Sequence, residues 1–109
     1  MAAEALEIDV ATLAAWREAG RPHAVLDVRE PWEVAIAPFP GALAVPMGEV
    51  PGRVADLPRA APLVVLCHHG GRSLRVTYWL RAQGLTEAVN LRGGIDAWSS
   101  EIDATVPVY

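Results

Sequence analysis

Short apolar runs alternate with amphipathic segments from one end of the chain to the other, which is typical of a sheet flanked by helices. The most continuous run, residues 62–66, reads Pro-Leu-Val-Val-Leu and indicates a strand that is covered on both faces. We place it at the centre of the sheet. Because helical segments separate nearly every pair of strands, the sheet should be mostly parallel. The predicted strands are residues 24–28, 43–45, 62–66 and 88–91.

Four segments carry the spacing of three and four residues between apolar positions that predicts a helix. Asp9 can cap the first of them and Gly20 can end it, while Gly84 can end the third. Pro51 lies in the first turn of the second, where a missing N–H is tolerated. The predicted helices are residues 10–19, 49–57, 73–83 and 95–100, the last directly after a Gly93-Gly94 turn.

The chain has 109 residues, of which 52% are hydrophobic and 20% charged, and this indicates one globular domain over residues 1–109. The net charge is −4 and all nine basic residues are arginines scattered along the chain, so we expect no nucleic-acid or membrane surface. The longest uncharged stretch, residues 34–48, contains three prolines and is too short to span a bilayer. Because the amino terminus lacks the pattern of a secretory signal, we expect a cytoplasmic protein.

A single cysteine, Cys67, stands directly after the strand that we place at the centre of the sheet. One cysteine forms no intramolecular disulfide and supplies no zinc framework, so it is either a small buried side chain or a reactive thiol. Ligands of parallel sheets collect at the carboxyl ends of the strands. Gly70 and Gly71 let the next loop curl with its N–H groups inward, and the following helix adds the positive end of its dipole. This setting favours a thiolate, so we interpret Cys67 as a nucleophile.

Four short segments stand in order along nearly the whole chain. They are Asp27-Val28-Arg29-Glu30, then Pro40-Gly41-Ala42, then Val64-Val65-Leu66-Cys67 with Arg72-Ser73, and finally Leu91-Arg92-Gly93-Gly94-Ile95-Asp96-Ala97-Trp98. In this order they resemble the rhodanese family of sulfurtransferases. That family usually has Gly-His-Ile ahead of Pro-Gly-Ala, whereas this chain has Ala37-Pro38-Phe39, which we take as a difference in a surface loop.

The resemblance implies an α/β fold with an open, mostly parallel sheet of about five strands flanked by helices on both faces. It also implies that the Cys67 thiolate takes the outer sulfur of a donor such as thiosulfate and holds it as a persulfide. A nucleophilic acceptor, such as cyanide, a thiol or a protein, then removes the sulfur, so the cycle needs no metal and no organic cofactor. The residues expected to bind the substrate are His68, His69, Gly70, Gly71 and Arg72.

Two other functions are compatible with such a loop. The related Cdc25-type phosphatases and arsenate reductases need a seven-residue loop, usually with His before the Cys. Here Cys67 to Arg72 spans six residues and follows Leu66, so the shorter loop favours a pocket for one sulfur atom over a pocket for a tetrahedral oxyanion. A non-catalytic binding or regulatory module with the same fold is the other possibility, and the presence of Cys67 argues against it.

The sequence leaves more than one role open for several side chains in and near the loop. His68 and His69 are either rim residues that meet the donor or acceptor, or solvated loop positions. Adjacent residues of one tight loop seldom converge on an ion, so we expect no metal site. Arg72 can bind an anionic donor or pair with a carboxylate such as Asp27. For Asp27 and Arg29 we favour a supporting role as a buried charge pair behind the loop.

The four tryptophans are assigned from their surroundings in the sequence. Trp16, Trp79 and Trp98 sit at helical spacing among aliphatic residues, and we expect them in the core. For Trp32 we expect ordinary packing as well, with a place near the mouth of the site as the alternative.

Overall fold

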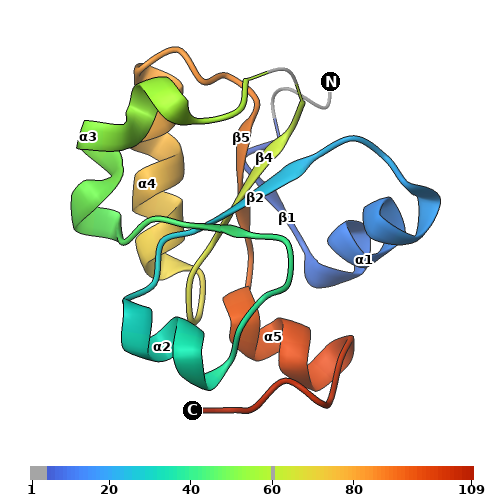
Figure 1. The fold of residues 1–109 in the computed structure, drawn as a ribbon. Coiled ribbons are helices and arrows are strands. Elements are labelled where there is room, and N and C mark those ends of the chain that lie inside the picture. The colour runs from blue at the N-terminus through green and yellow to red at the C-terminus, as the bar shows by residue number, and fades with distance from the viewer. Residues whose placement is uncertain (1–4, 60) are drawn as a thin grey trace.

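The computed structural model describes residues 5–59 and 61–109, and Figure 1 shows a central sheet with helices on both sides. The strands are β1 (Glu7–Ile8), β2 (Ala24–Asp27), β3 (Leu43–Ala44), β4 (Leu63–Leu66) and β5 (Ala88–Leu91). The helices are α1 (Val10–Ala19), α2 (Pro31–Ile36), α3 (Val50–Arg53), α4 (Gly71–Ala82) and α5 (Gly94–Glu101), with the short 3-10 helices η2 (Met47–Glu49) and η3 (Val54–Asp56) on either side of α3. The strand order is β1-β5-β4-β2-β3, with every pairing between these strands parallel.

The middle strand β4 is the run predicted to be covered on both faces. Leu63 and Val65 belong to the apolar cluster under α3 and α4, whereas Val64 and Leu66 belong to the cluster under α1 and α5. Successive side chains of a strand point to opposite faces, so a strand buried on both sides needs an unbroken apolar sequence. All four side chains are at most 2% exposed, which confirms the predicted position.

The predicted α/β class, the five strands and the helices on both faces are confirmed, and the sheet is wholly rather than mostly parallel between the described strands. The pattern of apolar residues did not predict β1. That strand has two residues, Glu7 and Ile8, which pair with Asn90 and Leu91 of β5. Two residues are too few to show an alternation, so only the pairing with β5 defines this edge strand.

Two helical regions differ from the prediction. α2 was not predicted, because its six residues are too short to show a period; it begins at Pro31 behind a capping box made by Glu30 and Glu33. The single helix predicted for residues 49–57 is instead divided into η2, α3 and η3. Pro51 cannot donate an N–H and therefore tolerates a helix only in its first turn, which is where α3 places it.

The caps of the longer helices agree with the sequence. Thr12 N donates to Asp9 Oδ1 over 2.8 Å at the start of α1, and Gly20 ends this helix at a φ of 67°. α4 begins at Gly71, two residues earlier than expected, because Gly70 at a φ of 104° turns the loop directly into the helix.

The aromatic residues are only in part where we expected them. Trp98 is buried in the core, while Trp16 and Trp79 are half-buried at the edges of the two clusters. Phe39 packs edge-on against Trp98 with 5.0 Å between ring centroids. Since Ala37 and Phe39 are 0% and 5% exposed, the assignment of residues 37–39 to a surface loop was wrong. Ala37 and Phe39 belong to the core, whereas Pro38 between them is exposed.

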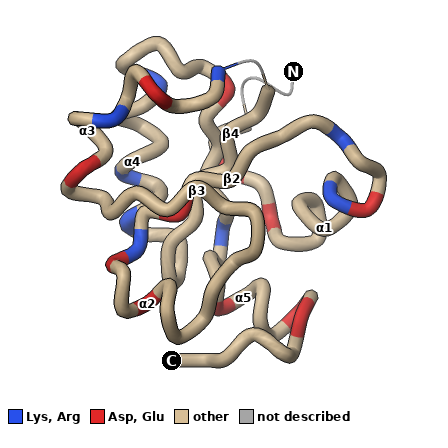
Figure 2. Tube along the Cα trace, viewed as in Figure 1, with Lys and Arg blue, Asp and Glu red and all other residues tan. Residues whose placement is uncertain are grey.

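Charged side chains are spread over the molecule. Figure 2 shows arginine and acidic positions interspersed along the trace in that view, in a chain whose net charge is −4. In residues 5–59 and 61–109, no helix combines the length and the apolar composition that crossing a bilayer requires.

Candidate active site

Strand β4 brings Cys67 to the carboxyl edge of the sheet, between the ends of β2 and β5. Asp27 is paired with Leu66, so the two strands end level, and Val28 N donates to Leu66 O over 3.0 Å. Residues 67–70 then turn back into the first turn of α4, a loop that can be followed in Figure 1 between β4 and α4. The Cys67 side chain is 1% exposed, so donor groups of the protein rather than bulk water surround its sulfur.

Three donor groups lie around the sulfur of Cys67. Gly70 N lies 3.1 Å from Sγ, Ser73 N 3.3 Å and the Ser73 hydroxyl oxygen 3.2 Å. Preorganised donors of this kind, together with the N-terminal end of the α4 dipole, stabilise negative charge on sulfur. The residues expected to bind the substrate were residues 68–72, whereas the donor groups at Sγ itself come from Gly70 and Ser73. Ser73 was named only as part of a motif; its place directly after Arg72, in the first turn of the helix, is the signal that could have identified it.

Helix α5 supports the loop from behind. Ile95 N donates to Cys67 O over 2.9 Å, and Asp96 N donates to His68 O over 3.1 Å. Gly94 adopts a φ of 60°, and a Cβ at this position would collide with the carbonyl oxygens of Cys67 and His68. The Gly93-Gly94 segment is therefore more than a turn, because it lets the backbone of the loop rest directly on the start of α5.

The two loop histidines form a stack with the last residue of the chain. The rings of His68 and His69 lie 3.9 Å apart at 18°, and the Tyr109 ring covers the other face of His68 at 4.0 Å and 10°. His69 is exposed, while His68 is partly buried and its Nε2 has no hydrogen-bond partner within residues 5–59 and 61–109. His69 therefore lies on the rim, as one interpretation of the sequence had it, whereas His68 is packed between two rings.

Within residues 5–59 and 61–109, His68, His69 and Asp96 form a group that could hold a metal ion, because their ligand atoms lie within 4.8 Å of one another. Imidazole binds a metal through a lone pair in the plane of its ring. Because the two rings are stacked nearly parallel, their lone pairs lie in separate planes and do not meet at one point. One ring would have to turn before both could bind a single ion, so the arrangement is not a preformed metal centre.

Arg72 is paired with a carboxylate, but not with the one proposed from the sequence. Its Nη1 and Nη2 donate to Glu33 Oε1 and Oε2 over 2.7 and 2.8 Å, so the contact is bidentate. Hydrogen bonds from Arg72 lower the pKa of the 3% exposed Glu33 to about 2. Glu33 belongs to α2, the helix that the sequence pattern did not predict, and this is why Asp27 was named in its place.

Tyr109 extends this pair into a network. Its hydroxyl donates to Glu33 Oε2 over 2.9 Å and accepts from Arg29 Nη1 over 3.1 Å, and burial raises its pKa. The same residue contacts the exposed Trp32, with the ring centroids 6.0 Å apart. Trp32 therefore lies beside Tyr109 near the loop, as the alternative had it, and it is mostly exposed instead of being packed as we expected.

The acid sensitivity of the Arg72–Glu33 pair gives a testable prediction. The ordinary pKa of a Glu carboxyl is 4.5, so a folded-state pKa of about 2 stabilises the fold fully above pH 4.5, and this stabilisation is lost as the pH falls towards 2. We expect Glu33→Gln to lower the free energy of unfolding by roughly 1–3 kcal/mol at pH 7 and by progressively less below pH 4.5. The upper end of this range is limited because solvent partly screens the charge of Arg72. Thermal melts of both proteins across this range measure the difference.

The control for this prediction is Glu18→Gln, which neutralises an exposed carboxylate of α1. It should melt like the wild type at every pH. A cost of Glu33→Gln that stays the same from pH 7 to pH 3 would mean that Glu33 stabilises the fold through packing rather than through its charge.

Asp27 and Arg29 form the buried charge pair that we predicted. Both are 1% exposed, and Arg29 Nε and Nη2 donate to Asp27 Oδ1 and Oδ2 over 2.9 and 2.7 Å. Arg29 Nη2 also donates to Ala37 O over 2.8 Å, which ties the pair to the segment before Phe39. The hydrogen bonds of the two side chains connect them with each other, with the backbone of Glu33 and Ala37 and with Tyr109.

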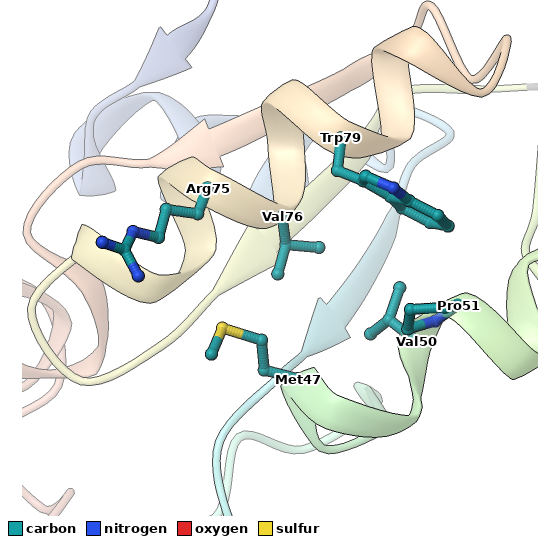
Figure 3. Close-up of a pocket in the computed structure, with 6 residues that line it drawn as sticks. All are labelled: Met47, Val50, Pro51, Arg75, Val76 and Trp79. Atoms are coloured by element: carbon teal, nitrogen blue, oxygen red, sulfur yellow. The ribbon is translucent and has the colours of Figure 1, made fainter.

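A separate groove lies on the same side of the sheet as α4. Figure 3 shows it between η2 and α3 on one side and α4 on the other. Its volume is about 170 Å³. Its lining is apolar apart from one exposed arginine and contains none of the residues expected to bind the substrate. The lining residues are Met47, Val50, Pro51, Arg75, Val76 and Trp79.

A parallel sheet with a cysteine loop at its carboxyl edge defines a class of protein, and comparison with known protein families identifies the same class. The family described as rhodanese-like domain matches residues 9–101, which is most of the chain. The chain therefore belongs to the rhodanese-like domain family, and the resemblance seen in its motifs is confirmed.

Three similar proteins illustrate this membership. The chain is 37% identical over 98 residues to the putative sulfurtransferase YtwF of Bacillus subtilis, covering 90% of this chain and 94% of that protein. The structure of the human single-domain sulfurtransferase TSTD1 matches with a TM-score of 0.77 and 27% identity, over 89% of this chain and 97% of that one. The chloroplastic rhodanese-like/PpiC domain-containing protein 12 of Arabidopsis thaliana is 38% identical over 89 residues, 78% of this chain, but the chain spans only 30% of its length.

Proposed function

We propose that this chain is a sulfurtransferase that moves a sulfane sulfur from a donor such as thiosulfate to a nucleophilic acceptor through a persulfide of Cys67. The observation that carries the proposal is the ring of donors around Sγ, formed by Gly70 N, Ser73 N and the Ser73 hydroxyl. The names of the sulfurtransferase relatives support the same chemistry. We further propose that the chain acts as one rhodanese-like domain in the cytoplasm, where a lone thiol stays reduced.

The proposed cycle has two displacement steps at sulfur. The Cys67 thiolate attacks the outer sulfur of thiosulfate, the S–S bond of the donor breaks, and its electron pair leaves with sulfite. The loop from His68 to Arg72 holds the outer sulfur of the resulting persulfide and its negative charge. A thiol, cyanide or a protein acceptor then attacks that outer sulfur, and the electron pair of the persulfide bond returns to Cys67. Both steps are nucleophilic displacements at the transferred sulfur, each forming one bond to it and breaking one, so the proposed cycle needs no metal and no organic cofactor.

The proposal is tested by the intact mass of the protein after incubation with thiosulfate. We expect a gain of one sulfur atom per chain, removed by cyanide with release of an equal amount of thiocyanate. Unchanged mass at every donor concentration, in protein whose Cys67 is shown to be reduced, would contradict the proposal and favour the non-catalytic binding module.

The length of the loop predicts selectivity against oxyanions. The six residues from Cys67 to Arg72 should fit one sulfur atom beside the thiolate but close too tightly around a phosphate for in-line attack. We therefore expect negligible hydrolysis of an aryl phosphate and negligible arsenate reduction beside sulfur transfer. Inserting one glycine between Gly70 and Gly71 should reduce persulfide transfer and allow phosphate or arsenate to bind.

The natural protein and the variant with the inserted glycine are both assayed with thiosulfate and with an aryl phosphate. The variant is also tested for binding of phosphate and arsenate. Phosphate-ester hydrolysis by the natural loop that disappears in Cys67→Ser would show that loop length does not decide the chemistry here.

A further inference from the structure

A chain of buried polar groups leads from Cys67 to the edge strand β1. Ser73 Oγ lies 3.2 Å from Cys67 Sγ and 2.5 Å from Asn90 Oδ1. Asn90 Nδ2 donates to Glu7 Oε2 over 2.8 Å and to Gly70 O over 3.2 Å. Ser73 and Asn90 are 0% and 1% exposed, so water does not replace these contacts.

These contacts determine which way the Asn90 amide faces. A carboxylate and a backbone carbonyl only accept hydrogen bonds, so Glu7 and Gly70 each take one of the two amide hydrogens. The opposite orientation would place the amide oxygen against two acceptors. Asn90 Oδ1 therefore faces Ser73.

The orientation of Asn90 in turn decides where the single hydroxyl hydrogen of Ser73 goes. Asn90 Oδ1 cannot donate, so its 2.5 Å distance from Ser73 Oγ requires the hydroxyl to donate to it. Ser73 then turns a lone pair towards Cys67 Sγ. A lone pair suits a thiol, which donates through S–H, but it repels a thiolate, which needs a donor.

We propose that Asn90 is a positioning residue that competes with the Cys67 thiolate for the hydroxyl hydrogen of Ser73. With Cys67 as a thiol, the S–H group donates to Ser73 and Ser73 donates to Asn90. When the thiolate forms, the hydroxyl rotates to Sγ, and Asn90 Oδ1 is left without a donor. Ser73 therefore favours the thiolate, and Asn90 opposes it by holding the same hydrogen.

The competition for the Ser73 hydrogen also operates during sulfur transfer, and this part of the inference rests on the proposed function. In the persulfide, Cys67 Sγ carries neither a hydrogen nor the negative charge, so the Ser73 hydroxyl returns to Asn90. When an acceptor takes the outer sulfur, the S–S bond breaks and its electron pair stays on Sγ. The hydroxyl then rotates back and donates to the thiolate as it leaves.

The charged and titratable groups around the loop stay the same in the variants that test this idea. Those groups come from the loop, from β1, α2, α4 and α5 and from the last residue of the chain. Neither Ser73→Ala nor Asn90→Leu changes the charge of any of them, although Asn90→Leu removes one hydrogen bond to Glu7. Both substitutions are neutral and nearly isosteric. The groups are His68, His69, Glu7, Glu33, Arg72, Asp96 and Tyr109.

The test is the rate at which iodoacetamide alkylates Cys67 in the full chain, measured from pH 5 to pH 10. We expect Asn90→Leu to raise the rate at mid-range pH by roughly 3- to 10-fold and Ser73→Ala to lower it by a similar factor. Both should reach the same plateau at high pH, where every Cys67 is a thiolate. Asn90→Leu should no longer accelerate the reaction in the Ser73→Ala background, because the hydroxyl hydrogen is gone there and only the contact of Asn90 with Gly70 O is left to lose.

Thermal melts show which variants are folded. Glu7→Gln keeps an acceptor for the Asn90 amide, so its alkylation rate should equal that of the wild type. A slower reaction of Asn90→Leu, or an acceleration that persists in the double variant, overturns the inference. If Asn90→Leu does not fold, Ser73→Ala alone tests the inference. An alkylation rate of Ser73→Ala that equals the wild-type rate at every pH would then contradict it. The readout needs no sulfur donor, so failure of the persulfide experiment is distinguishable from failure here.

Discussion

Replacing Cys67 by serine is expected to abolish both persulfide formation and sulfur transfer while the chain remains folded. Cys67 is the only cysteine of the sequence, so no second thiol can take over. A serine hydroxyl is a much weaker nucleophile at neutral pH, because it is not ionised there. We expect transfer from thiosulfate to cyanide to fall at least about 1,000-fold, as removal of a covalent nucleophile typically does.

The measurement combines intact mass after thiosulfate with the release of thiocyanate, and Ser100→Ala is the matched control. Ser100 is exposed on α5 and lies outside the cysteine loop, so its removal should leave the persulfide in place. A gain of sulfur mass by Cys67→Ser, or continued release of thiocyanate, would show that the sulfur is not carried where we propose.

The second large effect concerns stability. Asp27→Ala should destabilise the fold by about 3–5 kcal/mol, because it leaves the 1% exposed Arg29 as a buried charge without its partner. For a domain of this size, the melting temperature should fall by more than about 10 °C. Any loss of sulfur transfer should then follow the loss of folded protein.

Two variants separate charge burial from other causes. Asp56→Ala breaks the exposed contact with Arg53 at 3.3 Å and should cost less than about 1 kcal/mol. Replacing both partners, as Asp27→Leu with Arg29→Met, should recover part of the stability, since the unpaired charge is gone. An Asp27→Ala protein that melts like the wild type but transfers no sulfur would give Asp27 a part in the chemistry.

Several features of the fold and site were encoded locally and could be predicted from the sequence. The apolar run of β4 has to be buried on both faces, and this places Cys67 at the edge of the sheet whatever surrounds it. The cap at Asp9 and the turn at Gly20 depend only on residues within the same helix. The Asp27–Arg29 pair spans two positions and could also be predicted, because a buried charge at the end of a strand needs a nearby partner.

Other features involve partners that are far apart in the sequence. Arg72 and Glu33 are 39 positions apart, and the sequence offers several carboxylates for that arginine. The choice depends on α2, a helix of six residues that is too short to show a period. Tyr109 reaches Glu33 across 76 positions, so its stacking on His68 has no local signal at all.

The sequence by itself determined the α/β class, the central strand and the nucleophile that follows it, because periodicity, caps and turns act between neighbours along the chain. Tertiary structure alone decided which groups surround that nucleophile. β1 exists only through its pairing with β5, and that pairing sets Glu7 beside Asn90 and, through Asn90, the hydroxyl of Ser73. Hydrogen bonds of this kind depend on angles and distances of tenths of an ångström, which are set by packing between elements and leave no pattern in the order of residues.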